Sequence, residues 1–174
     1  MTLFSPHTWW LTGLPSAGKT TLANALVVRL RADAIPACVI DGDEIRQGLC
    51  RDLGFSAADR AENMRRVAEL ARLINQSGIH AVIALVSPTR QGRARAREII
   101  GGDRFIEVHV ATPLAVCEER DPKGLYRRAR NGELADLTGI SAAYEAPAAP
   151  DIRIDTSRCD VAKAIDQLLN RAIK

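Results

Sequence analysis

A glycine-rich segment that ends in lysine and threonine is the part of this sequence best suited to chemistry. Residues 13–20 read Gly-Leu-Pro-Ser-Ala-Gly-Lys-Thr and match the phosphate-loop pattern G-x-x-x-x-G-K-S/T. The glycines permit a tight turn in which backbone N–H groups point at phosphate oxygens, and the following helix adds the positive end of its dipole. We expect Lys19 to reach the β- and γ-phosphates of a nucleotide and Thr20 to bind Mg²⁺. The predicted nucleotide-binding residues are Gly13, Leu14, Pro15, Ser16, Ala17, Gly18, Lys19, Thr20 and Thr21.

Two acidic residues, Asp41 and Asp43, follow the second apolar stretch. In open α/β sheets ligands bind beyond the carboxyl ends of the strands, so one of these acids should face the bound phosphates. A carboxylate there can take the proton of an attacking hydroxyl or hold magnesium-bound water. For Asp43 we favour this catalytic interpretation, whereas Asp41 and Gly42 could also form a plain turn. A guanine-specific GTPase would carry an N-K-x-D segment, which the sequence lacks.

Hydrophobic patterning indicates alternating strands and helices around these motifs. Near-continuous apolar runs, such as residues 81–86, are typical of strands that are covered on both faces. Ser56 followed by Asp59 has the spacing of a helix capping box. We predict strands at 8–13, 37–41, 80–86, 104–110 and 151–155, and helices at 19–32, 57–77, 91–100, 113–120 and 160–172.

This order of elements predicts an α/β fold of the P-loop NTPase type, a three-layer α/β/α sandwich with a mainly parallel five-stranded sheet. Residues 121–147 interrupt the alternation. They are rich in Lys, Arg, Gly and Pro and are too long for an ordinary connection, so we expect a lid there. The length of 174 residues fits a single kinase-sized domain, 1–174, and we expect no fused second domain.

Composition and charge narrow the class of partner. The net charge is +3, with 47% hydrophobic and 26% charged residues, which favours local anion pockets over a nucleic-acid-binding surface. The sequence shows neither an apolar run long enough for a membrane span nor an N-terminal secretory pattern. The four cysteines include no C-x-x-C pair, which argues against zinc and favours reduced thiols in the cytoplasm. Within the basic stretch 90–97, we expect Arg95 and Arg97 to lie on a solvated helix face.

Segments along nearly the whole chain resemble the adenylyl-sulfate kinase family. They include Asp-Gly-Asp at 41–43, Leu-Gly-Phe-Ser at 53–56, Arg-Ala-Glu-Asn at 60–63, Ser-Pro at 87–88, Asp-Pro-Lys-Gly-Leu-Tyr at 121–126, Leu-Thr-Gly-Ile at 137–140 and Tyr-Glu-Ala-Pro at 144–147. The resemblance implies transfer of the γ-phosphoryl group of MgATP to the 3′-hydroxyl of adenosine 5′-phosphosulfate (APS), which gives 3′-phosphoadenosine 5′-phosphosulfate. It also implies Mg²⁺ as the cofactor, ATP and APS as partners, and a homodimer as one assembly to expect.

The same resemblance assigns roles to individual residues. Asp43 is the base or hydroxyl-orienting residue, and Lys19 and Lys123 act with it in catalysis. Phe55 stacks on the acceptor adenine, although a core aromatic is the alternative for this residue. We expect the ATP base near residues 156–161. The implied acceptor-binding residues are Asp43, Arg46, Phe55, Arg60, Asn63, Ser87, Lys123, Leu137 and Thr138.

Four positions depart from the family pattern, which usually has Asn at Glu44, Phe or Tyr at Thr89, Asp at Gly92 and Phe at Leu137. Leu137 removes one of two aromatic faces around the acceptor base, where stacking contributes about 1–3 kcal/mol. Glu44 adds a negative charge near an anionic acceptor and would need an arginine partner, Arg46 or Arg90. Two alternatives follow: a kinase for another nucleotide, such as a cytidine diphosphoramidate, or a nucleotide-binding module without catalysis. Retention of Lys19, Thr20 and Asp43 opposes the second alternative.

Overall fold

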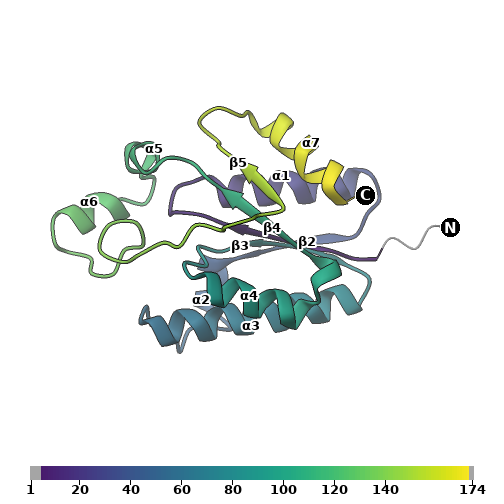
Figure 1. The fold of residues 1–174 in the computed structure, drawn as a ribbon, viewed down its shortest axis with the longest axis horizontal. Helices are drawn as coiled ribbons and strands as arrows, with labels where there is room; N and C mark the ends of the chain where they lie inside the picture. The colour runs from purple at the N-terminus through teal and green to yellow at the C-terminus, as the bar shows by residue number, and fades with distance from the viewer. Residues whose placement is uncertain (1–4, 173–174) are drawn as a thin grey trace.

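A five-stranded sheet forms the middle layer of the molecule in a computed structural model, which describes residues 5–172 (Figure 1). The strand order is β2-β3-β1-β4-β5, and every neighbouring pair is parallel. The prediction of a mainly parallel five-stranded sheet is confirmed. The strands are β1 (Thr8–Thr12), β2 (Ala37–Asp41), β3 (His80–Ala84), β4 (Phe105–Val110) and β5 (Ile152–Ile154).

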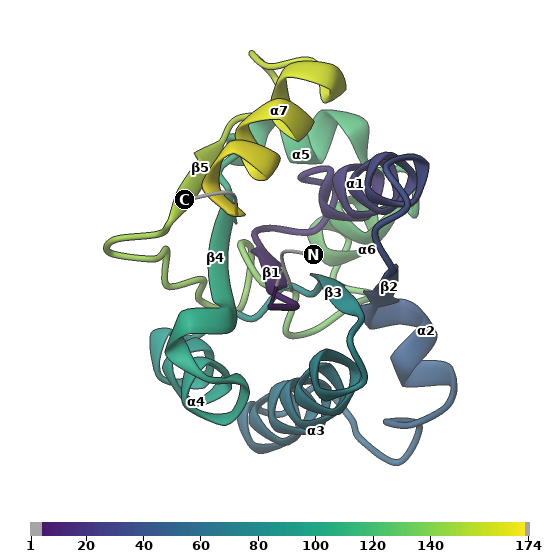
Figure 2. The ribbon, with the colours of Figure 1, turned by 90° about the vertical axis from the view of Figure 1, so that its right-hand side faces the viewer.

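Helices cover both faces of the sheet (Figure 2). One core lies under α1 and α7 and includes Leu22 and Leu168, and a second core lies under α3 and α4 and includes Val67 and Ile83. This arrangement is the predicted three-layer sandwich. The helices are α1 (Lys19–Ala32), α2 (Gly42–Gln47), α3 (Ala57–Gln76), α4 (Arg90–Ile100), α5 (Leu114–Arg120), α6 (Leu125–Arg130) and α7 (Val161–Ala172), with a 3-10 turn η1 (Gly102–Arg104).

The predicted helices and strands agree with the structure to within a few residues, but α2 and α6 are additions. Each is six residues long, too short to show a hydrophobic repeat in the sequence. The predicted strand 80–86 is also too long, because β3 ends at Ala84. The N-cap half of the predicted capping box is confirmed at the start of α3, where the Ser56 hydroxyl accepts a hydrogen bond from the Asp59 N–H at 3.1 Å. The Asp59 carboxylate in turn accepts from the Ser56 hydroxyl at 2.7 Å.

The prediction of a solvated arginine face on α4 is correct for Arg95 and wrong for Arg97. Arg95 is 65% exposed and pairs with Glu98 along the helix. Arg97 forms an ion pair with Asp151 at 2.8 Å, and its guanidinium lies over the Phe105 ring. The reason is helical geometry, since a residue two positions along points to a different side of the helix.

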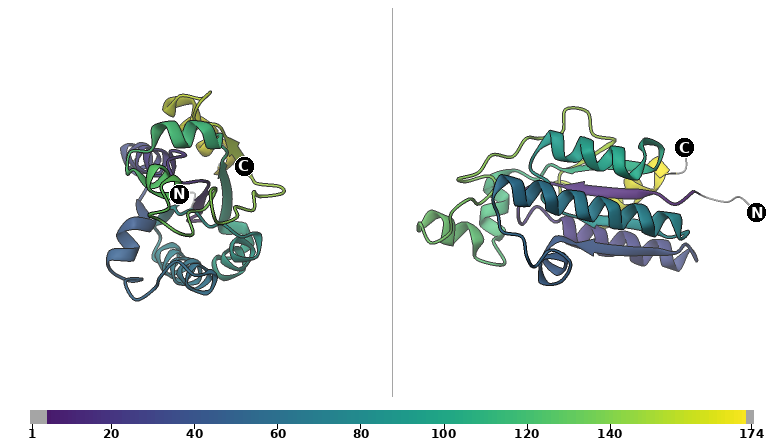
Figure 3. Two further views of the ribbon diagram at one scale, coloured as in Figure 1. Left: turned by 90° about the vertical axis from the view of Figure 1, so that its left-hand side faces the viewer. Right: turned by 90° about the horizontal axis from the view of Figure 1, so that it is seen from below.

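The predicted lid, residues 121–147, projects from one end of the sheet and carries α6 (Figures 1 and 3). Its return to the sheet passes close to the start of α4, because the Glu145 N–H donates to the Pro88 carbonyl at 2.8 Å. Among the described residues, no helix has the length and apolar character needed to cross a membrane.

Acidification should destabilise the fold through the buried His80. His80 is 7% exposed, and burial lowers its pKa to about 4 from an ordinary value of 6.5. As the pH falls from 6.5 to 4 the unfolded chain takes up this proton first, so the stability present above pH 6.5 is lost in that window. One pKa unit corresponds to about 1.4 kcal/mol. Urea denaturation at pH 7.5 and 4.5 should show a decline for the wild type and a smaller one for His80→Gln. Equal declines in both proteins would contradict this origin.

Candidate active site

The phosphate loop connects β1 to α1 and depends on two glycines. A Cβ atom on Gly13 would lie 2.4 Å from the Val110 carbonyl oxygen, so the loop can run this close to β4 only with glycine there. Gly18 precedes α1 with a φ of +101°, a left-handed conformation that side chains rarely adopt. Both glycines of the predicted motif therefore have a structural reason.

Lys19 lies buried inside the loop. Its ammonium group donates to the carbonyl oxygens of Gly13 at 3.0 Å and Leu14 at 2.7 Å. Desolvation by this burial lowers the pKa of Lys19 to about 8. The two carbonyl acceptors of Lys19 carry no net charge. A bound polyphosphate would give the ammonium an anionic partner and would favour the charged form of Lys19.

The two acids after β2 face different partners. Asp41 is buried and accepts from the Thr20 hydroxyl at 2.7 Å and from the Asp43 N–H at 2.9 Å, which makes it the N-cap of α2. Asp43 is exposed and pairs with the Lys123 ammonium of the lid. Asp41 is thus more than a plain turn residue, and it belongs beside the predicted magnesium ligand Thr20. In the sequence, the position of Asp41 at the end of a predicted strand already indicated a place near the bound phosphates.

Phe55 and two arginines form a cluster on the side of the cavity formed by α2 and α3. The guanidinium carbons of Arg46 and Arg60 lie 4.4 and 5.5 Å from the centre of the Phe55 ring. Phe55 is 59% exposed, so the alternative of a core aromatic is wrong. Arg60 also reaches the lid, where it donates to the Asp136 carbonyl at 2.7 Å and to the Thr138 hydroxyl at 3.2 Å.

Asn63 is 1% exposed, and its side-chain nitrogen has no hydrogen-bond partner within the described part of the chain. A buried polar group without a partner costs roughly 1–3 kcal/mol, so such groups call for an explanation. Asn63 lines the cavity one helical turn from Arg60. An oxygen atom of a bound ligand could accept a hydrogen bond from the Asn63 side-chain nitrogen.

The lid is anchored to the phosphate loop by Tyr126. This residue is 2% exposed, and its hydroxyl donates to the Pro15 carbonyl at 2.9 Å. Asp121 supports the start of α6 by accepting from the Tyr126 and Arg127 N–H groups. Lys123 is held on the same short segment, which places its ammonium against Asp43.

One cavity of about 950 Å³ lies between the phosphate loop, α3 and the lid. It brings together most of the predicted site residues, while Gly13, Leu14 and Ala17 shape the loop from behind its surface. Thr156 and Val161, from the segment expected near the ATP base, also line it. The predicted residues on its wall are Pro15, Ser16, Gly18, Lys19, Thr20, Thr21, Asp43, Arg46, Phe55, Arg60, Asn63, Ser87, Lys123, Leu137 and Thr138.

Three of the four departures from the family pattern lie outside the cavity wall. Thr89 is the N-cap of α4 and accepts from the Gly92 N–H at 3.2 Å. A Cβ on Gly92 would lie 2.1 Å from the end of Met64, so glycine there makes room for a residue that does line the cavity.

Glu44 is exposed, and the structure does not give it the predicted arginine partner. Arg46 donates instead to the Gly54 carbonyl, and Arg90 to the Ala146 carbonyl. The expectation of a Glu44 ion pair with either arginine is therefore wrong. The geometric reason is that the neighbouring loops present backbone oxygens to both guanidinium groups.

A family model described as adenylylsulphate kinase matches residues 5–155. The chain belongs to the adenylylsulphate kinase family. An adenylyl-sulfate kinase of Shewanella denitrificans is 52% identical over 165 residues, which cover 95% of this chain and 80% of the relative. This family is the one that the sequence resemblance predicted, and its members are ATP-dependent phosphotransferases.

Solved structures agree with this assignment. A Mycobacterium tuberculosis APS kinase, solved in complex with AMPPNP and APS, superposes with a TM-score of 0.93 at 40% identity and covers 98% of this chain and 99% of that one. A hexameric APS kinase from Thiobacillus denitrificans gives a TM-score of 0.72 at 31% identity, over 97% of this chain and 29% of that one. The adenylylsulphate kinase fold therefore extends over nearly the whole chain.

Nucleotide binding to this protein should be accompanied by proton uptake at alkaline pH. Because the pKa of Lys19 in the protein is about 8, most molecules carry a neutral Lys19 at pH 8.5. Bound phosphates should restore the charge of this side chain. We expect uptake of most of one proton at pH 8.5 and little at pH 6.5. Calorimetric titration with MgADP in two buffers of different ionisation enthalpy measures this uptake. Lys123→Ala keeps Lys19 and should keep the uptake; identical enthalpies in both buffers at pH 8.5 would refute the prediction.

Proposed function

We propose that this chain transfers the γ-phosphoryl group of MgATP to the 3′-hydroxyl of APS and produces 3′-phosphoadenosine 5′-phosphosulfate. The observation that carries the proposal is the unpaired, buried amide of Asn63, which faces the cavity between the phosphate loop and the arginine–phenylalanine cluster. Such a cavity has room for two nucleotides end to end, one with its phosphates in the loop and one with its base near Phe55.

The phosphate loop and Lys19 would hold the ATP phosphates. Thr20 and Asp41, whose side-chain oxygens lie 2.7 Å apart at the start of α1, would hold Mg²⁺ there directly or through water. The ion neutralises charge on the phosphates when it is bound. The pair suits Mg²⁺, which takes one or two protein oxygens and completes its shell with phosphate and water.

Asp43 would accept the proton of the 3′-hydroxyl while the ribose oxygen attacks the γ-phosphorus and ADP leaves. Lys123 pairs with Asp43 in the structure. A γ-phosphate that enters the same space would attract the ammonium away, which frees the Asp43 carboxylate and neutralises charge on the transferring group. A closed lid would also exclude the water that could otherwise hydrolyse ATP.

Arg46 and Arg60 would bind the phosphosulfate group of the acceptor, because the planar guanidinium fork matches anionic oxygens. Both lie over the same Phe55 ring, whose exposed face would stack on the adenine. Ser87 lines the same cavity, but its hydroxyl already accepts from the Trp10 indole at 2.8 Å. Its contribution is therefore the shape of the wall more than a hydrogen bond from its side chain.

A second candidate is phosphorylation of another nucleotide, such as a cytidine diphosphoramidate. Leu137, a non-aromatic residue that is 7% exposed, favours it, because it leaves Phe55 as the single aromatic side chain on the cavity wall within the described chain. APS remains the better fit, because the arginines, Asn63 and Phe55 are all in place. A homodimer and a cytoplasmic location stay predictions.

Acceptor identity is tested by an ADP-release assay with MgATP and matched concentrations of APS, AMP, CDP and cytidine diphosphoramidate. Lys19→Ala supplies the background rate. We expect turnover with APS to exceed that with each of the others at least tenfold. A preference for a cytidine nucleotide would overturn the acceptor and leave the reaction type intact. No acceptor-dependent release at all would favour the non-catalytic module.

Leu137→Phe should strengthen binding of an adenine acceptor. An added aromatic face contributes about 1 kcal/mol or more by stacking, so the KM for APS should fall roughly fivefold while the KM for ATP stays constant. Steady-state kinetics measure both constants. Leu114→Phe is the matched control, since Leu114 lies on α5 outside the cavity wall. An unchanged or raised KM for APS in Leu137→Phe would mean that the acceptor base lies elsewhere.

A further inference from the structure

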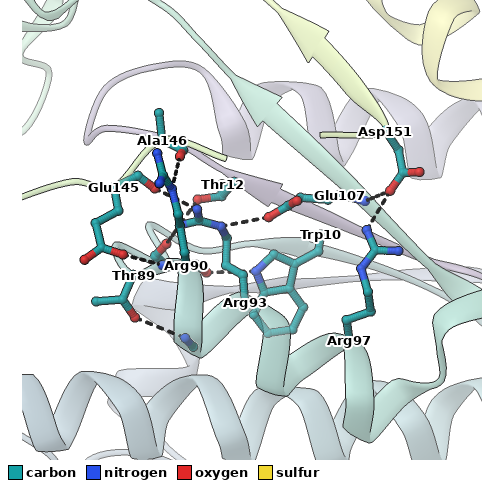
Figure 4. A network of polar contacts seen from close by, with 12 residues as sticks. Trp10, Thr12, Thr89, Arg90, Arg93, Arg97, Glu107, Glu145, Ala146 and Asp151 are labelled. Carbon is teal, nitrogen blue, oxygen red and sulfur yellow. Dashed lines mark hydrogen bonds and ion pairs between the residues drawn. The ribbon is translucent and has the colours of Figure 1, made fainter. Parts of the chain in front are cut away.

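A buried arginine behind the cavity joins three parts of the molecule. Arg93 is 2% exposed and does not line the cavity. Its guanidinium donates to the Glu107 carboxylate at 2.8 Å, to the Ser87 carbonyl at 2.7 Å and to the Glu145 carbonyl at 2.6 Å (Figure 4). These partners lie on β4, on the loop after β3 and on the returning end of the lid.

Residues 144–146, which we call the lid-return segment, are fastened at several points. The N–H of Arg90 donates to the Glu145 carboxylate at 2.8 Å, and the Arg90 guanidinium donates to the Ala146 carbonyl at 2.8 Å. The hydroxyl of Tyr144 lies 3.0 Å from that of Thr12, at the carboxyl end of β1. The lid-return segment is therefore tied to the start of α4 and to the centre of the sheet.

Ser87 links this network to the cavity wall. Its φ of +48° is in the left-handed region, which is unfavourable for a residue with a side chain. The conformation is held from two sides, because the Ser87 hydroxyl accepts from Trp10 and its carbonyl accepts from Arg93. The same guanidinium thus fixes one wall of the cavity and the end of the lid.

The Arg93–Glu107 ion pair is a poor device for stability alone. Its side chains are 2% and 14% exposed, and removal of two charges from water offsets much of their attraction. What the guanidinium provides is a rigid fork that bonds three separate acceptors in one plane. Lysine has a single charged nitrogen on a flexible stem and cannot reproduce that geometry.

We propose that Arg93 is a positioning residue for phosphoryl transfer. It couples the lid-return segment to the Ser87 wall, so that the closed lid and the bound acceptor keep a fixed position relative to each other. The phosphoryl-transfer part of this inference rests on the proposed function. The coupling of lid and wall does not, since it follows from contacts of the chain with itself.

The test compares Arg93→Lys with Arg97→Lys. Arg97 lies one turn further along α4 and also forms an ion pair, but with Asp151 (Figure 4). Its other acceptor is the Phe105 carbonyl. We expect Arg93→Lys to lower kcat with APS at least tenfold, to raise the ratio of ADP released to acceptor phosphorylated, and to leave the KM for ATP within twofold. Arg97→Lys should change none of these, even where it lowers Tm.

Limited trypsin digestion supplies a readout that needs no substrate. The lid carries several cleavage sites, and Arg93→Lys should speed cleavage within 121–143 severalfold, whereas Arg97→Lys should not. If the wild type fails to phosphorylate APS, the proposed function is wrong. The digestion still tests whether Arg93 couples the lid to the Ser87 wall. A loss of Tm in Arg93→Lys with unchanged product ratio and unchanged cleavage would overturn the inference.

Glu145→Ala keeps the test decisive if Arg93→Lys does not fold. The Glu145 side chain is exposed, and its removal frees the Arg90 N–H without opening the core. We expect faster lid cleavage and a raised ADP-to-product ratio in this variant, in the same direction as Arg93→Lys and smaller. Wild-type values for both quantities would count against the coupling.

Discussion

The parallel pairing of β1 with both β3 and β4 is the constraint on which the site depends. The register pairs Leu11 with Ala84 and Thr12 with His109, and β2 ends at Asp41 opposite the same Ala84. Because the carboxyl ends of parallel strands meet at one edge, the phosphate loop, the acidic pair and the Ser87 loop leave the sheet as neighbours. Residues that are more than forty positions apart in the sequence thereby reach one cavity.

Contacts of the chain with itself hold the lid against the rest of the molecule. Lys123 pairs with the Asp43 carboxylate, and Arg60 donates to the Asp136 carbonyl and the Thr138 hydroxyl. Lys19 likewise donates to backbone carbonyls of its own loop. All three cations line the cavity, where under the proposed function phosphate and phosphosulfate oxygens would replace these partners.

Much of this organisation could be predicted from the sequence, because the signals are local. The phosphate loop is a contiguous pattern, and the long helices and buried strands repeat apolar residues at their own periods. Asp43 follows from its place after a strand. The short helices α2 and α6 could not be predicted from the sequence, since six residues do not complete a periodic pattern.

Long-range contacts account for what the sequence could not provide. Arg93 and Arg97 look alike among neighbouring arginines, and only the fold shows that one reaches Glu107 and the other Asp151. The predicted ion pair of Glu44 with Arg46 or Arg90 failed for the same reason, because backbone oxygens of neighbouring loops accept from both guanidinium groups. The unpaired amide of Asn63 is likewise visible only when its surroundings are known.

The most direct test of the account is ³¹P NMR of the product formed from APS and MgATP, for the wild type and Asp43→Asn. We expect a new phosphomonoester signal coupled to the ribose 3′-proton. We also expect a rate about a hundredfold or more lower in Asp43→Asn, with nucleotide affinity unchanged. Phosphate at another position, or an Asp43→Asn rate within threefold of the wild type, would contradict the placement of the acceptor hydroxyl at Asp43.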